Sequence, residues 1–103
     1  MNVKSDAAEH AEEFAALCRA LGTLRAPDEY ARFLRDLCTP AEIMALTERW
    51  RIARLLHEGD MTYRDIAAAT GASTATVGRV ARFLKDEPHQ GYGIALRRTA
   101  TQK

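Results

Sequence analysis

The chain has 103 residues, of which 47% are hydrophobic and 28% are charged, and its formal net charge is +1 at pH 7. This length suits one domain, and the composition is typical of a soluble globular protein and excludes a disordered chain. No apolar stretch approaches the ~18 residues of a transmembrane helix, and the N-terminus lacks the hydrophobic run of a signal peptide. A cytoplasmic protein that does not bind membranes is therefore expected.

The charges are unevenly distributed along the sequence. Residues 1–48 contain five Lys or Arg and nine Asp or Glu, whereas residues 49–103 contain ten and five. The second half is therefore the half suited to binding phosphates. The two cysteines, Cys18 and Cys38, and the three histidines show no spacing typical of metal ligands, so no metal site is expected.

Two helices are predicted before residue 39. The first spans about Ser5 to Leu24, where apolar residues recur at helical spacing. The second begins at Pro27, because proline suits the first turn of a helix and the acids Asp28 and Glu29 suit the helix dipole there. The apolar pattern gives this second helix a length of about ten residues.

A third helix is predicted directly after Thr39, which forms a capping-box pattern with Glu42, and Gly59 is placed to end it in a left-handed conformation. Apolar residues between positions 40 and 57 cover much of the circumference of this helix. A helix of that kind needs neighbours on several sides. In a short chain, a second copy of the chain is an economical neighbour.

Residues 62–85 have the pattern of a helix-turn-helix. Thr62 and Asp65 form a second capping box at the start of its first helix. Gly71 lies in the turn, where a positive φ suits glycine, and Ser73 is positioned to cap the second helix. The inward positions that hold the two helices together carry small or branched apolar residues, namely Ile66, Ala67, Ala72, Val77 and Val80.

The outward face of the second of these helices carries the candidate DNA contacts. Threonine hydroxyl and methyl groups can contact base edges, and an alanine can approach a thymine methyl group. Arginines can pair with guanine or, more commonly, with phosphate, and Arg64 in the first helix is placed for the DNA backbone. The candidates on the second helix are Ser73, Thr74, Ala75, Thr76, Gly78, Arg79 and Arg82.

Residues 91–103 form a predicted C-terminal tail. Its short apolar group, Tyr92, Ile94 and Leu96, is expected to dock back on the core, and residues 98–103 are expected to fray.

Other interpretations of the helix pair remain open from these residues. Alanine-rich helix pairs also occur as ordinary hairpins, and some helix-turn-helix units bind protein, which would make this chain a dimeric helical adapter. An enzyme is not expected, because no Ser/His/Asp or Cys/His set falls at a plausible spacing and no glycine-rich phosphate loop is present.

Residues 39–85 together resemble the Trp repressor family, and in particular its YerC-like branch, without a gap. The resemblance rests on the segments Leu37–Glu42, Arg49–Ile52 and Leu55–Gly59 and on the helix-turn-helix that follows them. It implies an all-α, Trp-repressor-like helical bundle in which the N-terminal helices of two chains, the dimerisation helices of residues 5–57, intertwine into a homodimer. It also implies two recognition helices about one DNA turn apart, which suit a palindromic operator in double-stranded DNA.

The same resemblance implies a pocket for a small molecule. In the Trp repressor the tryptophan indole lies between two arginines that correspond to Arg49 and Arg79, with a threonine that corresponds to Thr39 nearby. Where the repressor has a glycine and a serine, this chain has Val80 and Phe83. Both changes add apolar volume and the second removes a polar contact, so the protein's own side chains are expected to fill the space.

The sequence therefore predicts one Trp-repressor-like domain over residues 1–103 that acts as a sequence-specific transcriptional regulator, with repression as the expected effect. No cofactor is expected, and L-tryptophan is disfavoured as a corepressor. The alternative is a repressor that responds to tryptophan or another amino acid.

Overall fold

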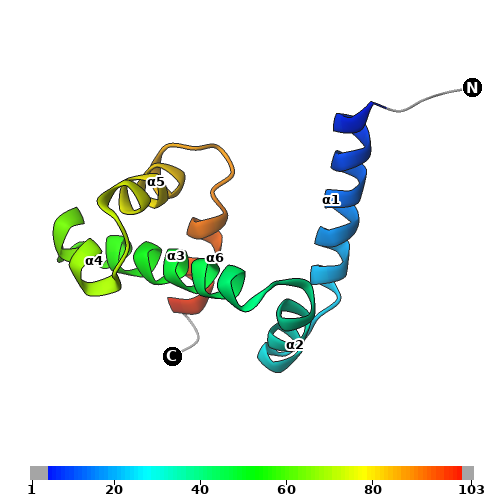
Figure 1. Ribbon diagram of the computed structural model, residues 1–103, viewed down its shortest axis with the longest axis horizontal. Coiled ribbons are helices and arrows are strands. Elements are labelled where there is room, and N and C mark those ends of the chain that lie inside the picture. The colour runs from blue at the N-terminus through cyan, green and yellow to red at the C-terminus, as the bar shows by residue number, and fades with distance from the viewer. Residues whose placement is uncertain (1–4, 101–103) are drawn as a thin grey trace, which may run out of the picture. The chain divides into compact units, whose positions relative to one another are not determined.

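The computed structural model describes residues 5–100, and within that range the chain forms six helices and no strand (Figure 1). The predicted all-α class is confirmed. No helix in the described range is long and apolar enough to cross a membrane. The helices are α1 (Asp6–Gly22), α2 (Pro27–Leu37), α3 (Pro40–Glu58), α4 (Tyr63–Thr70), α5 (Thr74–Lys85) and α6 (Gly91–Ala100).

The chain divides into two compact units between Pro40 and Ala41, named here the N-terminal unit and the C-terminal unit. In the N-terminal unit, α1 begins after Ser5, whose Oγ accepts the N–H of Ala8 at 3.1 Å. The helix ends at Gly22, slightly before the predicted end. The second helix begins at Pro27, as the sequence predicts.

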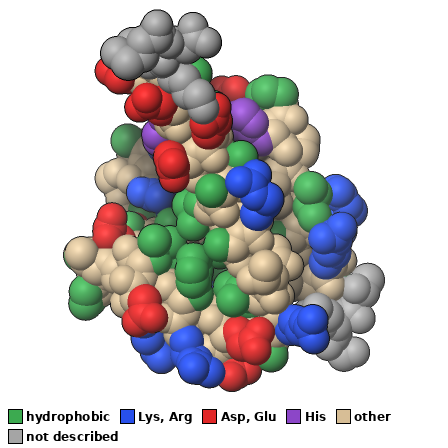
Figure 2. Space-filling view, turned by 90° about the vertical axis from the view of Figure 1, so that its right-hand side faces the viewer, with side chains coloured by type: hydrophobic (Ala, Val, Ile, Leu, Met, Phe, Trp, Pro, Cys, Tyr) green, Lys and Arg blue, Asp and Glu red, His purple; other side chains and the backbone are tan. Residues whose placement is uncertain are grey.

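The two helices of the N-terminal unit have no buried residue. Phe14 of α1 is 59% exposed and Leu37 of α2 is 52% exposed. Figure 2 shows many hydrophobic side chains at the surface of one face of the molecule. Since water is an unfavourable neighbour for large apolar side chains, burial of these exposed side chains would stabilise α1 and α2.

The core of the molecule lies in the C-terminal unit, where α3, α4 and α5 meet. Ile52 of α3, Ile66 of α4 and Val77 of α5 are fully buried, and Val80 is only 2% exposed. The predicted inward positions of the helix-turn-helix are therefore confirmed, with Ala67 and Ala72 partly buried against the same cluster. This core holds α5 firmly on one side and leaves its other side to solvent.

The predicted end of α3 and the predicted start of α4 are present in the structure. Gly59 has a φ of +81° and its N–H donates to the carbonyl of Leu55 at 3.3 Å. Asp65 N–H donates to the Thr62 hydroxyl at 3.1 Å, and Thr62 N–H donates to the Asp65 carboxylate at 3.3 Å. These reciprocal bonds form the capping box and satisfy backbone donors that a helix start leaves unpaired.

The C-terminal segment differs from the prediction of a tail, because residues from Gly91 to Ala100 form α6. Leu96 is 5% exposed and Tyr92 packs against the core cluster, so the predicted docking of the apolar group is confirmed for these two residues. Ile94, by contrast, is 41% exposed. Tyr92 and Leu96 are four residues apart and share a helix face, and their burial offsets the helix-weakening glycines nearby. Residues 101–103 of the predicted tail lie outside the described range.

Candidate nucleic-acid-binding surface

The turn between α4 and α5 is built by hydrogen bonds of three residues. Gly71 adopts the predicted positive φ, +79°, and its N–H donates to the carbonyl of Ala67 at 2.9 Å. The Thr70 hydroxyl donates to the carbonyl of Ile66 at 2.7 Å and accepts the N–H of Ala72 at 3.3 Å. This role of Thr70 was not predicted, although threonine beside a turn glycine is a residue type that bonds to nearby backbone. The turn is therefore rigidly defined before α5 begins.

The first turn of α5 is fixed by Ser73. Its Oγ accepts the N–H of Thr76 at 3.1 Å, which confirms the predicted N-cap. The same hydroxyl lies 3.0 Å from the Thr76 hydroxyl oxygen and donates to it. Thr76 is partly buried. Ser73 and Thr76, both predicted to contact DNA, therefore also stabilise the start of α5.

The face of α5 that points away from the core carries the other candidate residues. Four of them are exposed and lie on the same side of the helix, because their spacings of one, four and three residues keep them within one helical face. These are Thr74, Ala75, Arg79 and Arg82. Gly78 is partly exposed, and a Cβ atom there would meet nothing within 4 Å. The N-terminal part of this face is therefore small and shallow, which allows close approach of another surface.

The arginines of this face differ in their surroundings. The guanidinium of Arg79 lies 4.6 Å from the ring centroid of Phe83, and that of Arg82 lies 5.1 Å from it. Arg82 also pairs with Glu87, with 3.2 Å between Nε and Oε1. Arg64 is exposed near the start of α4. The positive charge of the helix-turn-helix is thus spread over its surface rather than concentrated at the start of α5.

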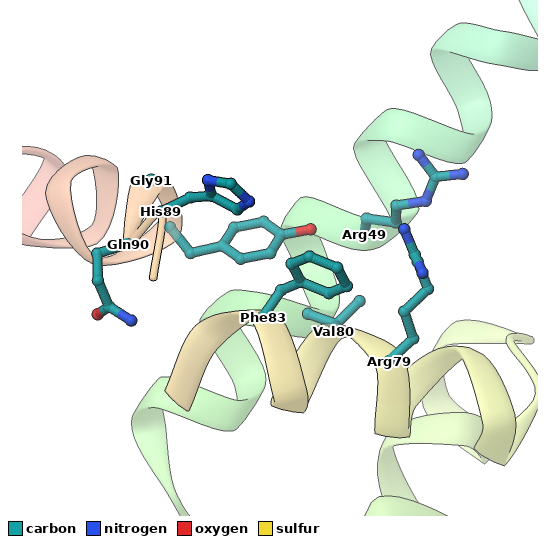
Figure 3. A pocket seen from close by; sticks show the side chains of 8 residues that line it. Arg49, Arg79, Val80, Phe83, His89, Gln90 and Gly91 are labelled. Atoms are coloured by element: carbon teal, nitrogen blue, oxygen red, sulfur yellow. The ribbon is translucent and has the colours of Figure 1, made fainter. Parts of the chain in front are cut away.

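A pocket of about 390 Å³ lies beside α5 in the C-terminal unit. Four of the five residues predicted for a small-molecule site line it: Arg49, Arg79, Val80 and Phe83. In Figure 3, Arg79 extends from α5 towards Arg49 on α3, and the ring of Phe83 lies nearby. Thr39, the fifth, belongs to the N-terminal unit and is not among the lining residues. Four of the five residues that the family resemblance grouped therefore lie around one cavity.

The other side of the pocket comes from the end of the turn between α5 and α6 and from the first residues of α6. His89 and Gln90 of the turn and Gly91 and Tyr92 of α6 complete the lining, and none of the four was predicted from the sequence to line a site. The only available signal was the apolar group after Gly91. Val80 and Phe83 both line this cavity, whose size is within the range of small-molecule sites, and the expectation that they fill the space of a tryptophan ligand stays a prediction. Among the described residues, no group of three or more His, Cys, Asp or Glu side chains could hold a metal ion.

Comparison with known proteins places these features in a family. The family model described as Trp repressor protein matches residues 12–100. The uncharacterized protein YerC of Bacillus subtilis (strain 168) is 42% identical over 87 residues, which cover 84% of this chain and 82% of YerC.

Two crystal structures share the fold and much of the sequence. A TrpR-like protein from Eubacterium eligens ATCC 27750 has a TM-score of 0.77 and 39% identity, covering 86% of this chain and 90% of its own. A second structure, from Staphylococcus aureus, has a TM-score of 0.77 and 36% identity, covering 86% of this chain and 87% of its own. The helix-turn-helix, the helix order and the sequence agree, and the chain belongs to the Trp repressor family, in the branch that contains YerC.

Proposed function

We propose that this protein is a sequence-specific DNA-binding transcriptional regulator, acting as a repressor, that places α5 in the major groove of double-stranded DNA. The observation that carries the proposal is the asymmetry of α5. Val77 and Val80 fix one side of the helix in the core, while Thr74, Ala75 and Arg79 remain exposed on the other. Membership of the Trp repressor family, whose members are DNA-binding regulators, supports the same assignment.

The side chains at the start of α5 suit base readout. In helix-turn-helix proteins, the N-terminal residues of the second helix contact base edges. Thr74 offers a hydroxyl and a methyl group, and Ala75 offers a methyl group for a thymine. Arg79 and Arg82 lie one and two turns further along α5, and Arg64 lies on α4. In the proposal these three arginines contact phosphates, and such contacts position the protein on the duplex. In this arrangement the short side chains read sequence and the arginines supply affinity.

The active form in this proposal is a homodimer built through α1, α2 and the start of α3. These segments leave large apolar side chains exposed, including Phe14, Leu37 and Met44, the last of which is 70% exposed. A second copy of the chain supplies the same apolar surface and buries both at once, as two-fold interfaces do. Two copies of α5 related by this symmetry suit a palindromic operator.

The proposed regulator works without tryptophan as a corepressor, because Phe83 offers no polar atom to the amino-acid end of such a ligand. The pocket favours a second candidate, a repressor that responds to tryptophan or another amino acid. Arg49 and Arg79 both line it, and a guanidinium binds carboxylates well. Titration calorimetry with L-tryptophan separates the two candidates. Binding heat that saturates at one tryptophan per chain supports the repressor that responds to an amino acid.

Selection of bound sequences from randomised duplex DNA tests the proposed function most directly. The expected product is an inverted repeat whose half-sites are about 10 base pairs apart, centre to centre. A protein with Thr74 and Ala75 both replaced by serine is the matched variant, and it is expected to select a different half-site while keeping the spacing. If the wild-type protein binds no duplex at low salt and instead retains a protein partner, the chain is an adapter and the proposal is wrong.

A further inference from the structure

The end of α5 places a carboxylate against an arginine that the proposed function assigns to DNA phosphate. Arg82 Nε lies 3.2 Å from Oε1 of Glu87. The same guanidinium lies over the ring of Phe83, 5.1 Å from its centroid. The side chain of Arg82 is therefore already held by the protein itself in the absence of nucleic acid.

The turn that follows α5 fixes the position of the carboxylate. The N–H groups of Asp86 and Glu87 both donate to the carbonyl of Arg82, at 2.8 and 3.1 Å. Gln90 Nε2 donates to the carbonyl of Glu87 at 2.7 Å, and Pro88 restricts the backbone between them. Because the backbone of Glu87 is tied to the residue with which its side chain pairs, little further backbone entropy is lost when the pair forms.

We propose that Glu87 competes with DNA phosphate for Arg82 and thereby lowers the affinity of α5 for DNA of any sequence. This inference rests on the proposed function. A carboxylate and a phosphate both accept hydrogen bonds from a guanidinium, so only one of them can hold the same donors at a time. When a phosphate takes Arg82, the released carboxylate is left close to the negatively charged duplex and repels it.

Arg79 lies on the same face of α5 as Arg82, but no carboxylate in the described part of the chain competes for its guanidinium. Its guanidinium lies over the ring of Phe83, at 4.6 Å, and it pairs with no carboxylate among the described residues. Arg79 is one turn closer to the start of α5 than Arg82 is. The two arginines share one aromatic ring, and Glu87 pairs with only one of them. The competition is therefore specific to the arginine at the far end of the helix.

The expected change in DNA affinity depends on how exposed the ion pair of Arg82 and Glu87 is to solvent. The side chain of Arg82 is 57% exposed and that of Glu87 is 32% exposed, so water and salt weaken the pair without removing it. Ion pairs of this kind change an equilibrium by up to about fivefold. Loss of the carboxylate is therefore expected to tighten DNA binding by about two- to fivefold for each copy of α5 that contacts the duplex.

The test compares Glu87→Gln with wild type and with Asp86→Asn. Glutamine keeps the shape of the side chain and the backbone bonds of the turn. Asp86 is the adjacent residue, is exposed and forms no ion pair within the described part of the chain, so its substitution removes the same charge without touching the pair. Fluorescence anisotropy of a labelled random-sequence duplex gives the affinity between about 50 and 200 mM NaCl.

Glu87→Gln is expected to bind the duplex more tightly than both other proteins and to show a steeper dependence of log K on log salt, by up to about one unit for each copy of α5. In an Arg82→Ala background, Glu87→Gln is expected to give no gain beyond that of Asp86→Asn. Thermal melting of each variant confirms that it is folded.

Either of two results overturns the inference alone: equal affinities of Glu87→Gln and Asp86→Asn in the wild-type background, or a Glu87→Gln gain that still exceeds that of Asp86→Asn in the Arg82→Ala background. If wild type and all variants fail to bind the duplex at low salt, the proposed function itself fails, and the inference with it.

Discussion

The hydroxyl of Ser73 accepts the backbone N–H of Thr76 at 3.1 Å and donates to the Thr76 hydroxyl at 3.0 Å. One side chain thus caps α5 and orients a second hydroxyl in the turn that, in our proposal, enters the DNA groove. The stability of the helix-turn-helix and the shape of its binding surface therefore depend on the same residue.

Ser73→Ala is expected to lower the free energy of unfolding by about 1 kcal/mol, because the N–H of Thr76 loses its acceptor. Urea unfolding followed by circular dichroism measures this change. Thr74→Ala is the matched control, since Thr74 is the next residue, is exposed and makes no side-chain hydrogen bond in the described structure. Equal destabilisation by the two substitutions would contradict the cap.

Gly71 and Gly78 are expected to respond oppositely to alanine. Gly71 has a φ of +79°, which strains an alanine by about 1–2 kcal/mol, so Gly71→Ala destabilises the protein. Gly78 lies in α5 with helical backbone and open space around its Cβ position, so Gly78→Ala stabilises it by about 0.5–1 kcal/mol.

The same pair of variants tests the binding surface. Gly78→Ala is expected to weaken DNA binding although it stabilises the fold, because its methyl group lies on the shallow face of α5. A melting temperature and an affinity measured on one preparation separate the two effects. If Gly78→Ala stabilises the protein and leaves DNA affinity unchanged, this part of α5 does not approach DNA closely.

Ile66→Ala is expected to cost about 2–5 kcal/mol of stability, because Ile66 is fully buried where α4 meets α3 and α5. Ile94→Ala removes the same atoms from a side chain that is 41% exposed, and we expect a loss well below that of Ile66→Ala. Denaturant unfolding of both proteins measures the difference, and similar losses would be inconsistent with the core described above.

Arg79→Ala is expected to weaken DNA binding and to reduce the slope of log K against log salt by about one for each recognition helix, if Arg79 contacts phosphate. Arg97→Ala, on α6, removes the same charge and is the control. A loss for Arg79→Ala that depends on one base pair of the operator would show instead that Arg79 reads a base.

Phe14→Asp is expected to shift the protein from dimer to monomer in sedimentation velocity, because it places a charge on the apolar face of α1. Phe14→Leu keeps that face apolar and is expected to leave the dimer intact. If wild type sediments as a monomer at all concentrations, the homodimer in the proposed function is wrong.

Features that depend on neighbours three or four residues apart could be predicted from the amino-acid sequence. The capping box of Thr62 and Asp65, the left-handed Gly71 and the cap at Ser73 were all predicted, because their hydrogen bonds join residues of one turn. The inward positions of α4 and α5 were predictable for a similar reason, since apolar periodicity marks the buried side of a helix.

The tertiary structure alone decided the features that depend on distant residues. Gly91 and Gly93 weaken a helix by local propensity, and the burial of Leu96 in the C-terminal unit favours the helical form of α6. The pocket likewise joins Arg49 of α3 to Tyr92 of α6, far apart in the chain, and no local pattern could place them together.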